Sequence, residues 1–168
     1  LEQGLELGRS FVQPSYQNRQ SLDYLWQGIG AYLRKYPHFR YLFGPASISP
    51  HYGEESIARI VYFYSIHYGG NGLPVTARNP FHIRPEHRRK FVAEFGGHDR
   101  EADFAVLRDA LARNGSSVPT LYKHYTQAAL PGGARFAAFS VDCQFGECVD
   151  GFVLVDLERL KPRKRKRY

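Results

Sequence analysis

An acid and a base stand three positions apart near the start of the chain, in the stretch LELGRSFV (5–12). A carboxylate such as Glu6 can accept a proton, and a guanidinium such as Arg9 can hold a carboxylate through two parallel hydrogen bonds. In a regular strand, however, residues three apart lie on opposite faces. From the spacing alone we interpret Glu6 and Arg9 as a structural pair that supports the strand.

A short polar loop follows this strand. Val12, Pro14 and Tyr16 lead into it, and Ser21, a residue type favoured as a helix N-cap, starts a helical pattern. Loop N–H groups and the N-terminal end of a helix can together hold a phosphate group. The segment 12–26 therefore predicts a phosphate-binding turn between a strand and a helix.

The elements that must position these residues alternate along the chain. Helical spacing of apolar residues predicts one helix that begins at Ser21 and is stopped by Pro37. It predicts three further helices over 54–68, 99–115 and 118–130. Strands are expected over 5–12, over 41–49 with a break at Gly44-Pro45, and over 134–143 and 151–160. The Gly-, Pro- and His-rich segment 70–98 is expected to be an irregular insertion. This order predicts an α/β fold of one domain, residues 1–160.

Composition restricts the function classes. The chain has 168 residues, of which 43% are hydrophobic, so it should form a packed core. No apolar run reaches the length of a membrane span. The net charge is +7, and much of it comes from the basic tail KPRKRKRY, 161–168. Such a tail binds anionic partners or remains a solvated end, and without a second nucleic-acid signature it does not predict nucleic-acid binding.

No metal site is expected. Cys143 and Cys148 form a single C-x4-C pair, a spacing that does not by itself indicate zinc, and the His residues show no metal-binding spacing. We interpret the two cysteines as free thiols in a reducing compartment.

The polar loop resembles the acyl-donor loop of the GNAT N-acyltransferase superfamily, V-x-P-x-Y-[RQ]-x-x-G-x-[GA]. Val12, Pro14, Tyr16 and Gln17 match this pattern, whereas Gln20 and Leu22 stand where the family has Gly. The stretches ELGRSFV, LWQGIGAYL, YLFGPASIS, VPTLYKHY and CVDGFVLVDLERL are similar to the GNAT subgroup called hemolysins, related to ornithine-acyl carrier protein N-acyltransferases. The pattern of Glu6, Arg9 and Val12 is also similar to that of the acyl-homoserine lactone synthases.

This resemblance implies a GNAT-like mixed, twisted sheet flanked by helices, with the N-terminal strands of the fold missing from this chain. It also implies a β-bulge at Gly8, which would bring Glu6 and Arg9 to one face and free an N–H group for the thioester carbonyl. Glu6 would deprotonate or orient the acceptor amine, Arg9 would hold Glu6 or the acceptor carboxylate, and Tyr64 would protonate the leaving thiolate. The implied donor-binding residues are Val12, Tyr16, Gln17, Asn18, Arg19, Gln20 and Ser21.

The activity implied by the resemblance is transfer of a long-chain 3-hydroxyacyl group to the α-amine of an amino acid such as ornithine. The donor would be a thioester on the phosphopantetheine of acyl carrier protein, which needs less room in the loop than acyl-CoA. Acyl carrier protein, an amino acid acceptor and an anionic inner-membrane surface, contacted by the basic tail, are the expected partners. The expected location is the bacterial cytoplasm or the inner membrane. The alternative is a non-catalytic module that binds acyl carrier protein or anionic membrane.

Overall fold

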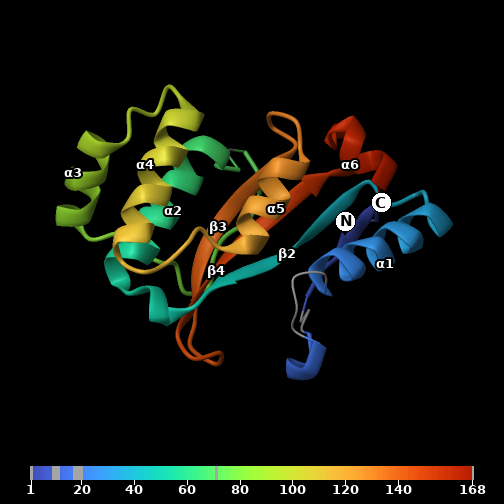
Figure 1. Cartoon of the computed structure of the whole chain (residues 1–168), viewed down its shortest axis with the longest axis horizontal. Coiled ribbons are helices and arrows are strands. Elements are labelled where there is room, and N and C mark those ends of the chain that lie inside the picture. Colours follow the sequence, from blue (N-terminus) through green and yellow to red (C-terminus); the bar gives the residue numbers. More distant parts are fainter. Residues whose placement is uncertain (1, 9–11, 17–20, 71, 168) are drawn as a thin grey trace.

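The computed structural model describes residues 2–8, 12–16, 21–70 and 72–167. These residues form a mixed α/β structure, which confirms the expected fold class (Figure 1). In chain order the elements are β1 (Gly4–Glu6), α1 (Ser21–Lys35), β2 (Tyr41–Ile48), α2 (Glu54–Tyr68), α3 (Pro85–Glu94), α4 (Arg100–Arg113), α5 (Thr120–Ala128), β3 (Ala134–Asp142), β4 (Cys148–Asp156) and α6 (Pro162–Arg167).

The strands form one four-stranded sheet in the order β1-β2-β4-β3. β1 is parallel to β2, and the pairs β2–β4 and β4–β3 are antiparallel. Parallel neighbours need a crossover connection, which α1 provides. The strand expected over 5–12 is shorter than predicted: Leu5 and Glu6 belong to β1, Leu7, Gly8 and Val12 lie outside it, and 9–11 lie outside the described residues.

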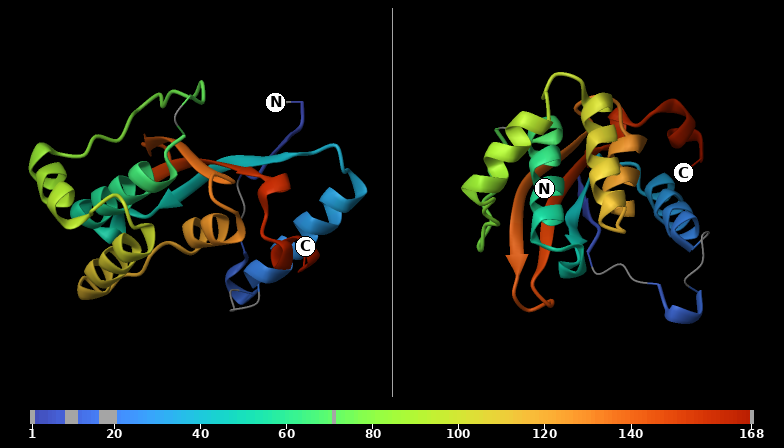
Figure 2. Two further views of the ribbon diagram at one scale, coloured as in Figure 1. Left: turned by 90° about the horizontal axis from the view of Figure 1, so that it is seen from above. Right: turned by 60° about the vertical axis from the view of Figure 1, so that its left-hand side comes forward.

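Helices cover one face of the sheet, and the core lies between them. Alternate side chains of β2 and β4 point to this side and are at most 3% exposed: Leu42, Ala46, Ile48, Val149, Val153 and Val155. The left-hand view of Figure 2 shows α1 and α5 on the same side of the sheet. On the opposite face the side chains of Phe43, Phe152 and Leu154 are half-buried.

Tyr122 of α5 locks the helix layer to the sheet. Its hydroxyl donates a hydrogen bond to the Ala46 carbonyl over 2.9 Å, and its ring packs on Phe136 with 4.7 Å between centroids. A Cβ atom at Gly151 would lie 2.5 Å from that hydroxyl oxygen. Position 151 therefore has to be glycine for α5 to approach the sheet this closely.

The segment 70–98 is not irregular throughout, because it contains α3. This helix was missed since its sequence is mostly polar and Phe91 is its one buried residue. The buried Arg59 of α2 holds it in place: its guanidinium pairs with Glu94, and it lies 4.7 Å from the centroid of the Phe91 ring. Before α3, hydrogen bonds from Gly70 to Phe136 and from Phe81 to Phe139 protect the outer edge of β3.

Two other strand predictions need correction. β2 runs without a break through Gly44 and Pro45. β4 begins at Cys148, before the expected start at 151, and ends at Asp156, whose carboxylate accepts the Glu158 N–H and starts a 3-10 turn. Within the basic tail 161–168, Pro162–Arg167 form α6, and residues 161–163 and 165 are exposed.

A buried contact between a carboxylate and an imidazole ring joins α2 to α4. Asp103 is 4% exposed, and one of its carboxylate oxygens lies 2.8 Å from the ring nitrogen Nε2 of His67. The N–H groups of Gly96 and Gly97 donate to the same carboxylate over 2.9 and 2.8 Å. Burial alone would raise the pKa of Asp103, but these N–H groups and His67 outweigh it and hold that pKa below its usual range.

Asp103→Asn should lower the free energy of unfolding at neutral pH by about 1.5–3 kcal/mol, because charge-assisted hydrogen bonds are lost. Because the pKa of Asp103 is lower in the folded than in the unfolded protein, its carboxylate stabilises the fold at pH values above the unfolded-state pKa. This stabilisation is lost as the pH falls through the folded-state pKa. The gap between wild type and variant should therefore close below about pH 4 in denaturant titrations. The exposed Asp109→Asn on the same helix is the control, with little expected change. Equal effects of both substitutions would contradict this account.

Candidate active site

β1 and β2 part shortly after they begin to pair. Their ladder joins Gly4–Glu6 to Tyr41–Phe43, and one more hydrogen bond runs from the Leu7 N–H to the Phe43 carbonyl over 2.7 Å. The next position on this edge of β2 is Pro45, which has no N–H group to donate. Within the described residues, β2 continues beyond Phe43 without a β1 partner.

Gly44 makes the close approach at this point possible. Its φ is +154°, and a Cβ atom there would lie 2.6 Å from the Leu7 carbonyl oxygen. Any other residue would push the end of β1 away from β2. Gly44 and Pro45 together thus determine where the strands separate.

Among the described residues, this leaves one edge of β2 open after Phe43. In β2 the odd-numbered residues point their backbone groups toward β1, as Tyr41 and Phe43 do. By the same alternation the carbonyl of Pro45 and both backbone groups of Ser47 point into the gap, and no described residue hydrogen-bonds them. An extended ligand with amide groups could pair with this edge as an added strand.

A pocket of about 310 Å³ lies at this edge, between α1, β2 and α5. It is mainly apolar and is lined by Leu7, Leu22, Leu25, Trp26, Ile29, Pro45, Ser47, Leu121, Tyr125 and Phe145. Trp26 packs edge-on against Tyr125, with 5.5 Å between ring centroids, and forms the wall between the two helices. The pocket therefore combines an apolar interior with a polar backbone rim.

A smaller cavity continues behind this wall. Its volume is about 40 Å³, and it shares Trp26, Ile29 and Tyr125 with the first pocket. Its remaining lining comes from α1, the sheet, α5 and the C-terminal segment: Gly30, Leu33, Leu42, His124, Ala128, Val155, Leu157, Leu160 and Lys164. The volume exceeds the roughly 10–15 Å³ that one water needs, yet the lining offers few polar partners. Such a space suits the end of an apolar chain better than water.

Glu6 lies beside the gap, but on the other face of the sheet. It is in register with Phe43, which is on the face without helices, and its side chain is exposed. The carboxylate turns along the chain toward Gly8: its Oε1 atom is 3.2 Å from the position a Cβ at Gly8 would take. Gly8 lies beyond the paired residues of β1, and Arg9 lies outside the described residues, so the expected bulge and the Glu6–Arg9 pair stay predictions.

Tyr64 lies in the core. Its side chain is 0% exposed, its ring packs against Tyr122 and Phe136 with 4.9 Å between centroids in each case, and it lines neither cavity. Burial raises the pKa of Tyr64 far above its usual value, so the hydroxyl stays protonated. A proton donor has to be in this form, but the structure does not bring this hydroxyl to the pocket.

The expected donor loop is described in part. Val12 is half-buried, Tyr16 is 66% exposed, and the Ser21 hydroxyl donates to the Tyr16 carbonyl at the start of α1. Gln17, Asn18, Arg19 and Gln20 lie outside the described residues. The described ends of the loop thus lead to the N-terminus of α1, as the phosphate-binding prediction requires.

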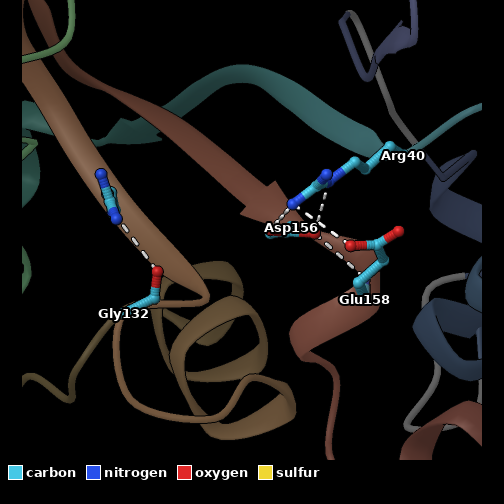
Figure 3. Close-up of polar contacts among 5 residues, drawn as sticks. Arg40, Gly132, Asp156 and Glu158 are labelled. Atoms are coloured by element: carbon cyan, nitrogen blue, oxygen red, sulfur yellow. Dashed lines mark hydrogen bonds and ion pairs between the residues drawn. The ribbon is translucent and has the colours of Figure 1, made fainter.

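A second, polar pocket of about 430 Å³ was not anticipated from the sequence. It lies on the face without helices and includes Arg40, Arg135, Asp156 and Arg159. Figure 3 shows Arg40 between Asp156 and Glu158, to which it lies at 3.0 and 3.2 Å. The Arg135 side chain donates a hydrogen bond to the Gly132 carbonyl over 3.3 Å. These contacts tie the start of β2 to the end of β4. They stabilise the end of the sheet where β2 begins and β4 ends, away from the gap after Phe43.

Among the described residues, no group of three or more His, Cys, Asp or Glu side chains is placed to hold a metal ion. In the same part of the chain, no helix is both long and apolar enough to cross a membrane.

The chain is similar to two curated glycine N(alpha)-acyltransferases. It is 27% identical to the protein from Phocaeicola vulgatus over 172 residues, which cover 98% of this chain and 52% of that protein. It is 27% identical to the protein from Bacteroides thetaiotaomicron over 175 residues, with 100% and 51% covered. The chain thus spans about half the length of these relatives.

A shorter similarity joins the chain to the L-ornithine N(alpha)-acyltransferase of Brucella abortus. The two are 46% identical over 43 residues, which cover 26% of this chain and 15% of that protein. No family model matches the chain, and no solved structure matches it. The three similarities relate the chain to amino acid N-acyltransferases.

Gly44→Ala should lower the free energy of unfolding by about 1–3 kcal/mol, because the added methyl group meets the Leu7 carbonyl. Gly28→Ala is the matched control: Gly28 is an exposed position of α1 with no atom within 4 Å of the added Cβ, and there alanine should stabilise by about 0.5–1 kcal/mol. Both are measured by urea titration. Two variants of equal stability would show that Gly44 does not determine where the strands part.

Proposed function

We propose that this chain carries the acyl-thioester site of an N-acyltransferase that acylates the α-amine of an amino acid. The observation that supports this most is the apolar pocket beside the end of the β1–β2 ladder, on whose rim the edge of β2 has no partner among the described residues. The similarity to named N-acyltransferases along the whole chain supports the same activity.

The donor we propose is a long-chain, 3-hydroxyacyl thioester on acyl carrier protein, with acyl-CoA as the other possible donor. The phosphopantetheine arm has two amide groups that could pair with Pro45 and Ser47 on the β2 edge. The acyl chain of the thioester would occupy the pocket beside Trp26 and Ile29. Its phosphate would lie at the loop 12–21, near the N-terminus of α1, where N–H groups favour an anion.

The reaction forms one bond and breaks one. The amine nitrogen attacks the thioester carbonyl carbon, the carbon–sulfur bond breaks, and the carrier thiolate leaves and takes a proton. An amino acid amine is mostly protonated at neutral pH, so a base has to remove a proton first. Glu6, exposed at the end of the paired part of β1, is the base we propose, with Arg9 holding it or the acceptor carboxylate. A role for Tyr64 as proton donor would require a path from the core to the thiolate.

Two acceptors compete. The relatives that align along the whole chain are named for glycine, and the relative that aligns over 43 residues is named for L-ornithine. We propose glycine as the first acceptor to test because of the longer alignment. Ornithine, which the resemblance implies and which would give a lyso-ornithine lipid, is the second.

The test is an acyl transfer assay with the protein in its natural length. Acyl carrier protein loaded with a long-chain acyl group is mixed with glycine or ornithine. We expect free carrier thiol to appear only when amino acid is present, and mass spectrometry to find the N-acyl amino acid. Tight binding of acyl carrier protein without thiol release or product would instead indicate the alternative, a non-catalytic binding module.

Glu6→Gln should reduce turnover by about 10²–10⁴-fold, because the amide keeps the shape of the side chain but cannot accept the proton. The melting temperature should hardly change, since the side chain is exposed. Glu2→Gln, an exposed acid on the same segment, is the control and should keep full activity. Normal turnover of Glu6→Gln together with a lower melting temperature would assign Glu6 a structural role.

A further inference from the structure

Asp150 carries a carboxylate without a partner in the middle of the sheet. It lies on β4, in register with Ser47 of β2 on one side and Ser140 of β3 on the other. The residue is half-buried, and its oxygen Oδ1 is buried without a hydrogen bond from any described residue. A buried carboxylate oxygen that lacks a donor costs free energy, so most such atoms in folded proteins have one. Asp150 therefore needs an explanation that its neighbours do not supply.

The two other aspartates of β3 and β4 do have partners. Asp142 accepts the N–H of Gln144 over 2.9 Å, and Asp156 pairs with Arg40 at 3.0 Å. The hydroxyl of Ser140, the cross-strand neighbour of Asp150, donates to the Asn79 carbonyl over 3.0 Å instead. Among the described residues no cationic side chain pairs with Asp150.

The surroundings of Asp150 are negatively charged. Burial, and after it the charges of Asp150 and Asp142, raise the pKa of the Cys148 thiol, two positions before Asp150 on β4. A metal ion would need further ligands of this kind, and the described part of the chain offers no cluster of them. An ammonium group, which a single carboxylate can hold through a charge-assisted hydrogen bond, suits the place better.

An apolar strip joins Asp150 to the gap beyond Phe43, on the face without helices. Ser47, whose backbone groups point into the gap, is the neighbour of Asp150 on β2, and adjacent strands are about 4.8 Å apart. Pro45 and Phe152 form the next pair on this face, and the Phe152 ring lies 6.0 Å from the Phe43 ring. A ligand that extends from the gap would thus cross apolar side chains and end at a carboxylate.

We propose that Asp150 binds the side-chain ammonium group of a diamino acid acceptor such as ornithine. The reacting α-amine has to be in the gap, at the thioester, whereas Asp150 lies one strand further into the sheet. A second ammonium group on a stem of methylene groups can span this distance and pack its stem on Pro45 and Phe152. Glycine has no such group, so Asp150 favours a diamino acid, although the longer alignments are to proteins named for glycine. The proposal rests on the acyl transfer proposed above and makes Asp150 a specificity-determining residue, not the base.

The test compares ornithine with norvaline, which has the same carbon chain without the second amine. In the transfer assay with the protein in its natural length, the KM for ornithine should be at least about tenfold lower than that for norvaline. In Asp150→Asn the KM for ornithine should rise by at least about tenfold and this difference should disappear, because a charge-assisted hydrogen bond is lost. An unchanged KM for ornithine, or an equal rise for norvaline or glycine, would overturn the proposal.

Asp142→Asn is the matched control. It removes the same charge from the adjacent strand, and the KM for ornithine should stay as in the wild type. Asp150→Asn should not lower the melting temperature of the free protein, because its carboxylate has no partner there to lose. A clear fall in melting temperature without a change in the KM for ornithine would assign Asp150 a structural role.

Thermal shift measurements test the site without turnover. Ornithine should raise the melting temperature of the wild type more than norvaline does, and this difference should be absent in Asp150→Asn. If no amine releases the carrier thiol but this selective shift is seen, the acyl transfer proposal fails and the Asp150 site stands. If neither a selective shift nor a KM difference is found, the Asp150 proposal is wrong, whether or not acyl transfer occurs.

Discussion

The separation of β1 from β2 is the constraint on which the rest of the structure depends. It is produced by two adjacent residues: Gly44 lets the Leu7 carbonyl approach, and Pro45 removes the next backbone donor on that edge. Proline in a strand is tolerated only where one edge has no partner. Among the described residues, the β2 edge after Phe43 is open, and at Pro45 the missing donor is a covalent property of the chain.

The crossover between the parallel strands turns this opening into a pocket. α1 has to return from β1 to β2 on one side of the sheet, and it brings Trp26 and Ile29 against the gap. α5 closes the pocket with Tyr125, and the Tyr122 hydroxyl fixes α5 to the Ala46 carbonyl. The same contacts that stabilise the core thus form the walls of the site, so the pocket should be largely formed before a ligand enters.

Sequence patterns predicted the long amphipathic elements well, because apolar spacing reports burial directly. They failed for α3, whose position depends on the distant Arg59 and not on its own polar sequence. They also missed the pocket, since its walls come from segments far apart in the chain. The one local signal was Pro45 inside an otherwise regular strand. Glu6 could be singled out by its chemistry, but the face on which it lies followed only from its register with Phe43.

The placement of these residues indicates from which side of the sheet each substrate of the proposed reaction would approach. The apolar cavities lie on the side of the sheet covered by helices, and Glu6 lies exposed on the other side. A thioester held between β1 and β2 would have its carbonyl at the level of the sheet. Its acyl chain would then extend toward Trp26, whereas a charged amino acid would approach from the solvent side, where Glu6 could take its proton. On this model the sheet itself separates the apolar substrate from the polar one, and the gap after Phe43 is where they meet.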